Sequence, residues 1–398
     1  MTDVRILHDE ADLLRANDIF RTAMVGLPHL GDLGPGEITE LLEPGRTLGA
    51  FHDGAMVGTA DSTGGVLTLP GGARVPHAAV THIGVLPTHT RRGILRALVT
   101  AQLRDARDRG DVVATLRASE ATIYERFGYG VASHSTSWEV ITRRAHLRGD
   151  ADRPVRLVAP DPDLCARIHT ETLGQRPGTI DRSPQWWAFR RRNGSEHPGY
   201  LALCGEPGTE TGYARYRPVD TGAWFTSGQR TVVVEDLVAD TPATFAALLR
   251  FLLTLDLVDR LVFTALPVDT ALPWLLTDRR AARQLSVSDE TWLRPLDVTG
   301  VLAGRRYRGS AAVVVEVVDD LLPENSGRYR ITPDGATATV DDAQLAVGAA
   351  ALGSVLLGGV RWHQLADSGR ARVVDPAALA DADDLFGWPR APFAGFWF

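Results

Sequence analysis

A strand, helix and strand unit occurs twice along the chain, and this repetition constrains the fold more than any other sequence feature. In the first copy, apolar spacing indicates a strand at residues 79–86, a helix at 94–109 and a strand at 112–116. The second copy repeats this order at residues 232–239, 242–255 and 261–266. A helical crossover joins parallel neighbours of one sheet. The sequence therefore predicts two tandem α/β units.

A different pattern begins after residue 290. Residues 313–318 and 329–332 are typical of strands, and residues 345–357 indicate a buried helix, which together predict a third unit of the α+β type. The proline-rich and charged segment 146–163 is typical of a linker. We therefore place the domain boundaries near residues 145 and 290, which gives units 1–145, 146–290 and 291–398.

Charge and residue usage exclude several classes of function. The 42 basic residues are outnumbered by 49 acidic ones, and a net charge of −7 argues against a surface that binds nucleic acid. Because all the basic residues are arginine, a Schiff-base lysine and a Walker A lysine are both excluded. The N-terminus lacks the layout of a signal peptide, and the longest uncharged apolar stretch, residues 345–360, is too short to span a membrane. We therefore expect a cytoplasmic protein without a membrane span.

The cysteines and histidines predict no metal site. Cys165 and Cys204 lie far apart without ligand spacing, and we expect both in the core. His77, His82 and His89 cluster near the first strand, but their five- and seven-residue steps match no metal motif.

The start of the first helix is a candidate phosphate site. Arg91, Arg92 and Gly93 precede it, and the unpaired amide groups of a helix N-terminus attract anions. An arginine pair at an ordinary helix start is an equally good interpretation on this evidence alone. The corresponding helix of the second copy follows Asp240, which would repel a phosphate. The sequence thus predicts that only the first unit binds an anion in this way.

Two strings of residues, Val80 to Leu95 and Ser119 to Gly130, resemble those of the enhanced intracellular survival (Eis) proteins, which belong to the GNAT superfamily of acetyltransferases. Thr90, however, stands where those proteins carry arginine. The resemblance extends over the whole chain and implies two tandem GNAT folds, of which only the first binds coenzyme. A sterol carrier protein-like α+β domain would follow.

The resemblance also implies acetyl-CoA as cosubstrate and assigns roles to particular residues. Tyr124 would be the acid that protonates the leaving thiolate, and the terminal carboxylate of Phe398 would be the base, whereas we assign Tyr129 to packing. The implied coenzyme-binding residues follow the backbone of the first strand, the start of the helix and the next loop: Ile83, Gly84, Val85, Arg91, Arg92, Gly93, Ile94, Leu95, Arg96, Ser119 and Glu120.

The C-terminus supports a separate physical argument. Phe393, Phe396, Trp397 and Phe398 are too apolar to remain in water, so we expect them to be buried and to carry the terminal carboxylate inward. A buried carboxylate costs free energy unless something pairs with it. The alternative to a catalytic base is therefore a packed end whose carboxylate meets an arginine.

The expected function is acetyl transfer from acetyl-CoA to an amine by direct attack on the thioester. The resemblance implies a cationic acceptor, such as an aminoglycoside or a polyamine, and a homohexamer. Holding such an acceptor needs carboxylates, and Asp18 and Asp32 are candidates. Arg190, Arg191 and Arg192 beside two tryptophans are more typical of a solvated helix face or a subunit contact than of a nucleic-acid site.

Two alternatives remain open at this point. One is acetylation of protein lysines, which needs an open groove rather than a deep pocket. The other is a non-catalytic lipid-binding protein with a degenerate acyltransferase fold, in which the apolar segment 345–360 lines a cavity.

Overall fold

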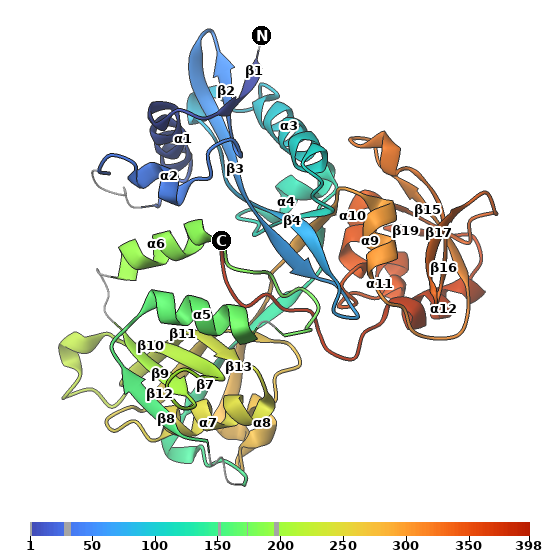
Figure 1. Cartoon of the computed structure of the whole chain (residues 1–398). Helices are drawn as coiled ribbons and strands as arrows, with labels where there is room; N and C mark the ends of the chain where they lie inside the picture. The colour runs from blue at the N-terminus through green and yellow to red at the C-terminus, as the bar shows by residue number, and fades with distance from the viewer. Residues whose placement is uncertain (1, 28–32, 150–152, 173, 195–198) are drawn as a thin grey trace.

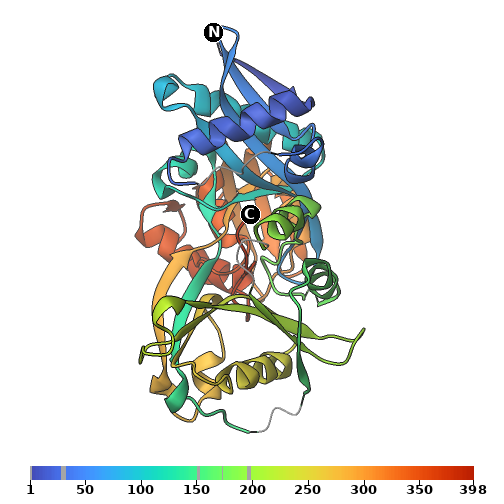
Figure 2. The same cartoon turned by 90° about the vertical axis from the view of Figure 1, so that its left-hand side faces the viewer.

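A computed structural model describes residues 2–27, 33–149, 153–172, 174–194 and 199–398 (Figure 1). These residues form two seven-stranded sheets and one five-stranded sheet. Figure 2 shows the first unit above the second, with the C-terminus of the chain between them. Among the described residues, no helix is both long and apolar enough to cross a membrane. The expected order of two α/β units and an α+β unit is confirmed.

The first sheet has the strand order β1-β2-β3-β4-β5-β14-β6. Its strands are β1 (Asp3–Leu7), β2 (Thr47–His52), β3 (Ala55–Thr68), β4 (Arg74–Val85), β5 (Val113–Leu116), β14 (Trp292–Pro295) and β6 (Gly130–Val131). The helices and 3₁₀ turns of this unit are α1 (Glu10–Ala23), α2 (Glu37–Leu41), η1 (Pro87–His89), α3 (Ile94–Asp108), α4 (Ala121–Tyr124) and η2 (Glu125–Phe127). The predicted order of strand, helix and strand is confirmed as β4, α3 and β5. Helix α3 buries Leu98 and Leu103 against the sheet, as its apolar spacing requires.

The second sheet has the strand order β13-β7-β12-β11-β10-β9-β8. Its strands are β13 (Ala282–Asp289), β7 (His134–Ile141), β12 (Arg260–Pro267), β11 (Thr231–Ala239), β10 (Gly212–Val219), β9 (Tyr200–Cys204) and β8 (Val155–Val158). The helices and 3₁₀ turns here are η3 (Thr142–Arg144), α5 (Pro162–Thr172), α6 (Pro184–Gly194), η4 (Thr221–Ala223), α7 (Pro242–Leu253), α8 (Leu272–Leu275) and η5 (Arg279–Ala281). Strands β11 and β12 are parallel, as β4 and β5 are. The predicted repeat is therefore present, but the expectation of a linker at 146–163 is wrong, because residues 155–158 pair with β9 as an edge strand.

The two seven-stranded sheets exchange strands across the expected boundaries. Strand β7 precedes residue 145 but pairs with β12 and β13 of the second sheet. Strand β14 follows residue 290 but lies between β5 and β6 of the first sheet. Each sheet is thus completed by a strand from beyond its own segment, which ties the two units together.

The third unit has the strand order β17-β16-β15-β18-β19. Its strands are β15 (Val313–Val318), β16 (Gly327–Thr332), β17 (Gly335–Thr339), β18 (Leu345–Gly348) and β19 (Ala371–Val373). Its helices and 3₁₀ turn are α9 (Val298–Gly304), η6 (Pro323–Asn325), α10 (Ala349–Val355), α11 (Trp362–Asp367) and α12 (Ala377–Phe386). The predicted single helix over 345–357 is wrong, because residues 345–348 pair in parallel with β15 before α10 begins. A short apolar run suits a buried strand as well as a buried helix, and only the partner strand decides.

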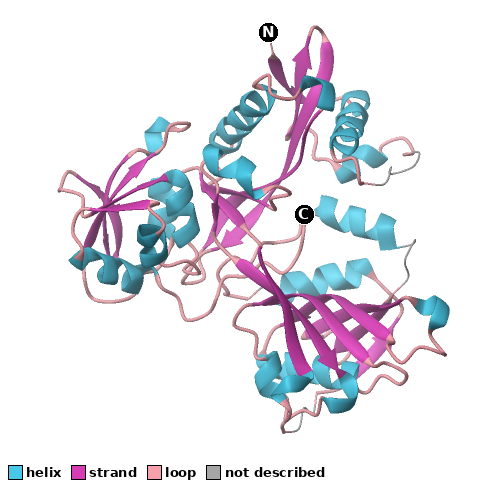
Figure 3. Ribbon diagram, turned by 180° about the vertical axis from the view of Figure 1, so that it is seen from behind, coloured by secondary structure: helices cyan, strands magenta, loops and turns pink. Residues whose placement is uncertain are grey.

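Helix α10 joins the third unit to the first sheet at close range (Figure 3). A side chain at Gly130 of β6 would lie 1.9 Å from the carbonyl oxygen of Ala350, and one at Gly353 would lie 2.3 Å from that of Leu293. Both glycines therefore permit a backbone approach that no other residue allows. Gly130 is one of the residues that resemble the Eis proteins, and its contact here is structural.

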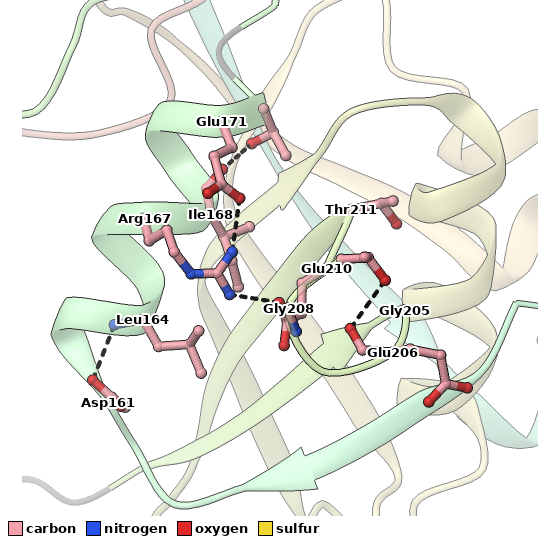
Figure 4. A network of polar contacts seen from close by, with 12 residues as sticks. Asp161, Leu164, Arg167, Ile168, Glu171, Gly205, Glu206, Gly208, Glu210 and Thr211 are labelled. Carbon is pink, nitrogen blue, oxygen red and sulfur yellow. Dashed lines mark hydrogen bonds and ion pairs between the residues drawn. The ribbon is translucent and has the colours of Figure 1, made fainter.

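A network of charged groups fixes helix α5 to the β9–β10 turn in the second unit (Figure 4). The Arg167 guanidinium donates to Glu171 at 2.7 Å and to the buried Glu210 at 2.5 Å. The Asp161 carboxylate accepts from the backbone N–H of Leu164 at 3.0 Å and so satisfies the start of the helix. This network holds the outer side of the second unit.

Burial of His77 in β4 predicts a loss of stability in acid. Burial, followed by the charges of Arg117 and Arg46, lowers the pKa of His77 to about 3. The unfolded chain takes up a proton near pH 6.5 and the folded chain does not, so stability is complete above pH 6.5 and falls as the pH falls below it. At pH 5 this histidine should lower the free energy of unfolding by about 2 kcal/mol. Urea unfolding at pH 7.5 and pH 5 should show a smaller acid loss for His77→Gln than for the wild type. An equal loss in both proteins would show that His77 is protonated in the folded state.

Candidate active site

A cavity of about 760 Å³ lies between the first and second units. Its wall comes from α1, β3, β4, the end of β5 and α4 on one side, and from α6, β11 and β12 on the other, with the C-terminal residues between them. Figures 1 and 2 place the C-terminus beside α6, where the two units face each other. No single domain contains this cavity.

The divergence of β4 and β5 opens the first sheet beside the cavity. The two parallel strands pair only from His77 to Ala79, whereas β4 continues to Val85 with β3 as its neighbour. From Val80 onward, the edge of β4 opposite β3 therefore has no described strand paired with it. An extended chain that contains amide groups, such as pantetheine, fits an edge of this kind because it can take the place of a strand.

A bulge in β4 turns His82 toward the cavity. The register between β3 and β4 shifts between Thr59 and Asp61, and His82 has a φ of +47°, which is strained for a residue with a side chain. The Nδ1 atom of His82 lies 3.3 Å from the Asp61 carboxylate, which also accepts from the Thr47 hydroxyl at 2.8 Å. Burial raises the pKa of Asp61, and its hydrogen bond from His82 opposes this shift.

The N-terminus of α3 is open to an anion. Gly93 precedes the helix with a φ of +81° and has open space where a side chain would lie, and both Arg91 and Arg92 are exposed. No side chain caps this terminus, and the first turn carries no acidic residue. These features fit a pyrophosphate. Thr90 donates instead to the carbonyl oxygen of Pro87 at 3.3 Å and belongs to the preceding turn.

The corresponding terminus in the second unit is closed. The Thr241 side chain caps α7 by accepting from the backbone N–H of Thr244. The Asp240 carboxylate accepts from the Thr244 hydroxyl at 2.5 Å. The start of α3 is open to an anion because, among the described residues, no side chain caps it and no carboxylate lies beside it. Neither condition holds at the start of α7.

Tyr124 lies at the end of α4, directly after β5, and its side chain reaches the cavity. The residue is 7% exposed. Burial raises the pKa of its phenol, a hydrogen bond with Ser119 opposes this shift, and the charge of Glu120 adds to it. The phenol therefore holds its proton near neutral pH and is able to donate it.

Tyr129 packs edge-on against Tyr124, with ring centroids 6.1 Å apart. Its hydroxyl is buried and has no hydrogen-bond partner among the described residues. Tyr129 does not line the cavity, which agrees with its assignment to packing.

The C-terminal segment is held in place by contacts with both units. The buried Glu290 carboxylate accepts from the backbone N–H groups of Ala394 at 3.2 Å and Gly395 at 2.8 Å. Arg117 donates to the carbonyl oxygen of Phe396 at 2.7 Å, and the Trp186 indole donates to that of Trp397 at 2.5 Å. These bonds fix the backbone up to the penultimate residue.

The aromatic residues of this segment differ in their burial. Phe396 is buried, Phe393 and Phe398 are half-buried, and Trp397 is 64% exposed, so the expected burial of all four is wrong for Trp397. The Phe398 ring packs under the Arg117 guanidinium at 5.1 Å from the ring centroid.

The structure brings only some of the predicted site residues together. Ile83, Ser119, Tyr124 and Phe398 line the cavity. The remaining coenzyme-binding candidates lie outside its lining, along the end of β4, at the start of α3 and beside α4: Gly84, Val85, Arg91, Arg92, Gly93, Ile94, Leu95, Arg96 and Glu120.

Several residues of the cavity were not predicted from the sequence. Asp18 is exposed and does not line the cavity, and Asp32 lies outside the described residues. The cavity instead contains charged side chains from elements that are distant in sequence: Arg21, Asp61, Arg117, Arg190, Arg192, Glu235 and Asp236. Helix α6, expected as a solvated face or a subunit contact, contributes Trp186 and Phe189 to the wall. None of these residues belongs to a local motif, since only the packing of the second unit against the first assembles them.

Comparison with known families agrees with this architecture. Residues 5–132 and 178–295 each match a family model described as an acetyltransferase (GNAT) domain, and residues 298–395 match one described as a sterol carrier protein domain. The fold and the open β4 edge thus define a GNAT-type N-acetyltransferase. The GNAT domains imply the use of acetyl-CoA.

Similar proteins identify the family within that class. The chain is 39% identical to an uncharacterized N-acetyltransferase of Streptomyces coelicolor, over 89% of this chain and 90% of that protein. It is 34% identical to N-acetyltransferase Eis of Mycobacterium tuberculosis, over 80% of each chain. The crystal structure of Eis1 from Mycobacterium abscessus superposes over the full length of both chains, with 46% identity and a TM-score of 0.93. The protein belongs to the Eis family of N-acetyltransferases, which confirms the predicted resemblance.

Proposed function

We propose that this enzyme transfers the acetyl group of acetyl-CoA to an amine of a small molecule by direct attack within the cavity between its two GNAT units. One observation supports this proposal most: the Tyr124 phenol and the free end of the chain line the same cavity, beside the open edge of β4. An acid and a base are the two groups that amide formation from a thioester requires.

In the proposed reaction, the coenzyme supplies an acetyl thioester whose carbonyl carbon gains the amine nitrogen as its bond to sulfur breaks. The terminal carboxylate of Phe398 accepts a proton from the acceptor ammonium, directly or through water, because an α-carboxyl group is ionised near neutral pH. The Tyr124 phenol donates its proton to the sulfur that leaves, and the second proton that the nitrogen loses as the amide forms restores the phenol. The backbone of Ile83, Gly84 and Val85 would position the pantetheine arm, with Ser119 and Glu120 nearby.

The phosphate end of the coenzyme would lie at the start of α3. There the first amide groups of the helix and the exposed Arg91, Arg92 and Arg96 face solvent around Gly93, with Ile94 and Leu95 as the first helical residues. A helix N-terminus and arginine side chains both favour a diphosphate.

Arg92→Glu is expected to weaken the binding of acetyl-CoA by about 10-fold or more, because it reverses a charge where the diphosphate should lie. Calorimetric titration measures the affinity and the stoichiometry. In the matched variant Asp240→Arg, at the helix of the second unit, the stoichiometry should stay at one coenzyme per chain. Unchanged affinity of Arg92→Glu would remove the phosphate assignment.

The reacting end of the acceptor is an ammonium group. The terminal carboxylate is available to it, whereas the Asp61 carboxylate is fully buried and already bonded to Thr47 and His82. The other two carboxylates are already neutralised. Asp236 forms a bidentate ion pair with Arg182 at 2.6 and 2.8 Å, and Glu235 lies 2.5 Å from Arg217. A polycation such as an aminoglycoside would need these pairs to open, whereas a small amine would not.

A panel assay of CoA release tests the acceptor class, with aminoglycosides, polyamines, amino acids and lysine peptides as acceptors. Turnover of small amines but not of peptides is expected, because the cavity has a volume of about 760 Å³, which is the size of a small-molecule site. Since the chain contains no lysine, acetyl-lysine found by mass spectrometry would come from the peptide alone. Turnover limited to peptides would instead support lysine acetylation of proteins.

We also propose that the enzyme is a homo-oligomer, a hexamer by resemblance to its family. Light scattering of the purified protein gives the mass directly, against 43.0 kDa for one chain. A monomeric mass would contradict this proposal without affecting the proposed reaction.

A further inference from the structure

Arg21 of helix α1 is the cavity arginine whose charge is least compensated. The residue is only 9% exposed and lines the cavity. Its Nε atom donates to the Asn17 side chain at 3.3 Å, and within the described residues its guanidinium forms no ion pair. A guanidinium stays charged in proteins, and a buried charge without a partner costs free energy.

The other arginines of the cavity have partners. Arg117 donates to Phe396 and Thr291, and Arg192 lies 2.9 Å from Glu37. Arg190 lies within 4.0 Å of Glu235 and against the Trp186 ring. Arg21 is therefore the arginine that an anion from outside would compensate most.

The surroundings of Arg21 strengthen this argument. Burial lowers its pKa, the exposed Asp18 of the same helix opposes this shift, and the positive charge of Arg192 adds to it. Two arginines, Arg21 from α1 and Arg192 from α6, thus line the same cavity, and only Arg192 has a carboxylate in an ion pair with it among the described residues, that of Glu37. The wall around them is aliphatic and aromatic: Phe20, Met24, Leu41, Leu42 and Phe189.

We infer that Arg21 binds an anionic group of the acceptor, so that the natural acceptor is an amine that also carries a carboxylate or another anionic oxygen group on an apolar frame. The ammonium end faces the terminal carboxylate, and the anionic end faces Arg21. The charges of the cavity then match those of a zwitterion. This inference rests on the proposed function, because it names the acceptor of the same site.

Matched acceptors test the inference. The wild type should acetylate aminohexanoate with a kcat/KM about 10- to 100-fold above that for hexylamine or diaminohexane, because a hydrogen bond between charged groups discriminates to this extent. Aminomethylbenzoate against benzylamine repeats the comparison on an aromatic frame. An aminoalkylphosphonate distinguishes a phosphate-like group from a carboxylate.

Arg21→Gln should remove this preference by raising KM for aminohexanoate at least ~10-fold more than KM for hexylamine. Arg15→Gln, an exposed position on the same helix, is the matched control and should keep the preference. The melting temperature and the CoA affinity of both variants show whether each remains folded. If Arg21→Gln does not fold, Arg21→Lys is compared in its place. Lysine keeps the charge but loses the planar, bidentate donors of the guanidinium, so the preference for aminohexanoate should fall.

Binding of hexanoate to the CoA complex of the enzyme separates this inference from the proposed reaction, since hexanoate has no amine. Calorimetry should detect it in the wild type and find it weakened in Arg21→Gln. If no amine is acetylated while hexanoate still binds through Arg21, the proposed reaction fails and the anion site stands. Equal kcat/KM for aminohexanoate and hexylamine, or hexanoate binding that is unaffected by Arg21→Gln, would overturn the inference.

Discussion

Tyr124→Phe should lower kcat by about 10² to 10⁴ while the affinity for acetyl-CoA is unchanged, which is the usual effect of removing a positioned acid. The phenol is buried beside Ser119, and its pKa is raised by burial, so it holds a proton that the leaving sulfur can take. Phenylalanine keeps the ring and its edge-on contact with Tyr129. The measurement is steady-state CoA release at saturating acceptor, with calorimetry for the coenzyme.

Tyr129→Phe is the matched control. It removes a hydroxyl that is buried without a partner among the described residues, so kcat should change little and stability should be equal or higher by about 1 kcal/mol. If Tyr124→Phe retained full turnover, Tyr124 would be a packing residue like its neighbour, and another group would have to protonate the sulfur.

Extension of the C-terminus by a short Gly-Ser segment should also reduce kcat by about 10² or more, because it moves the terminal charge away from the acceptor amine. The backbone up to Trp397 is held by Glu290, Arg117 and Trp186, so the fold should survive the extension. Melting temperature, coenzyme affinity and turnover are measured together on the native and extended proteins.

The same Gly-Ser segment placed at the N-terminus is the control and should leave turnover unchanged. A packing role alone predicts that melting temperature and activity fall together in proportion. Full turnover in the C-terminally extended protein would exclude the carboxylate of Phe398 as the base. The base would then be sought at His82, whose Nδ1 atom lies 3.3 Å from Asp61, at Glu120, or at a water held by β4.

Local sequence signals were sufficient where an element is determined by its own residues. The apolar spacing predicted the bounds of α3, α7 and β11 closely, whereas β4 begins at Arg74, before the strand expected from residue 79. Such signals failed at 345–348 and 155–158, where a strand exists because a distant partner pairs with it. Pairing between distant segments leaves little trace in the sequence of either one.

The sequence by itself determined the family, the two α/β units, the open helix terminus at Gly93 and the candidate acid Tyr124, because each depends on residues close together in the chain. Only the tertiary structure decided the exchange of β7 and β14 between the sheets and the composition of the cavity. Arg21, Asp61 and Asp236 come from three distant segments, and the pairing of Asp236 with Arg182 determines which carboxylates remain for an acceptor. The charge that a ligand meets depends on which opposite charges already lie within a few ångströms, and that proximity exists only in the folded chain.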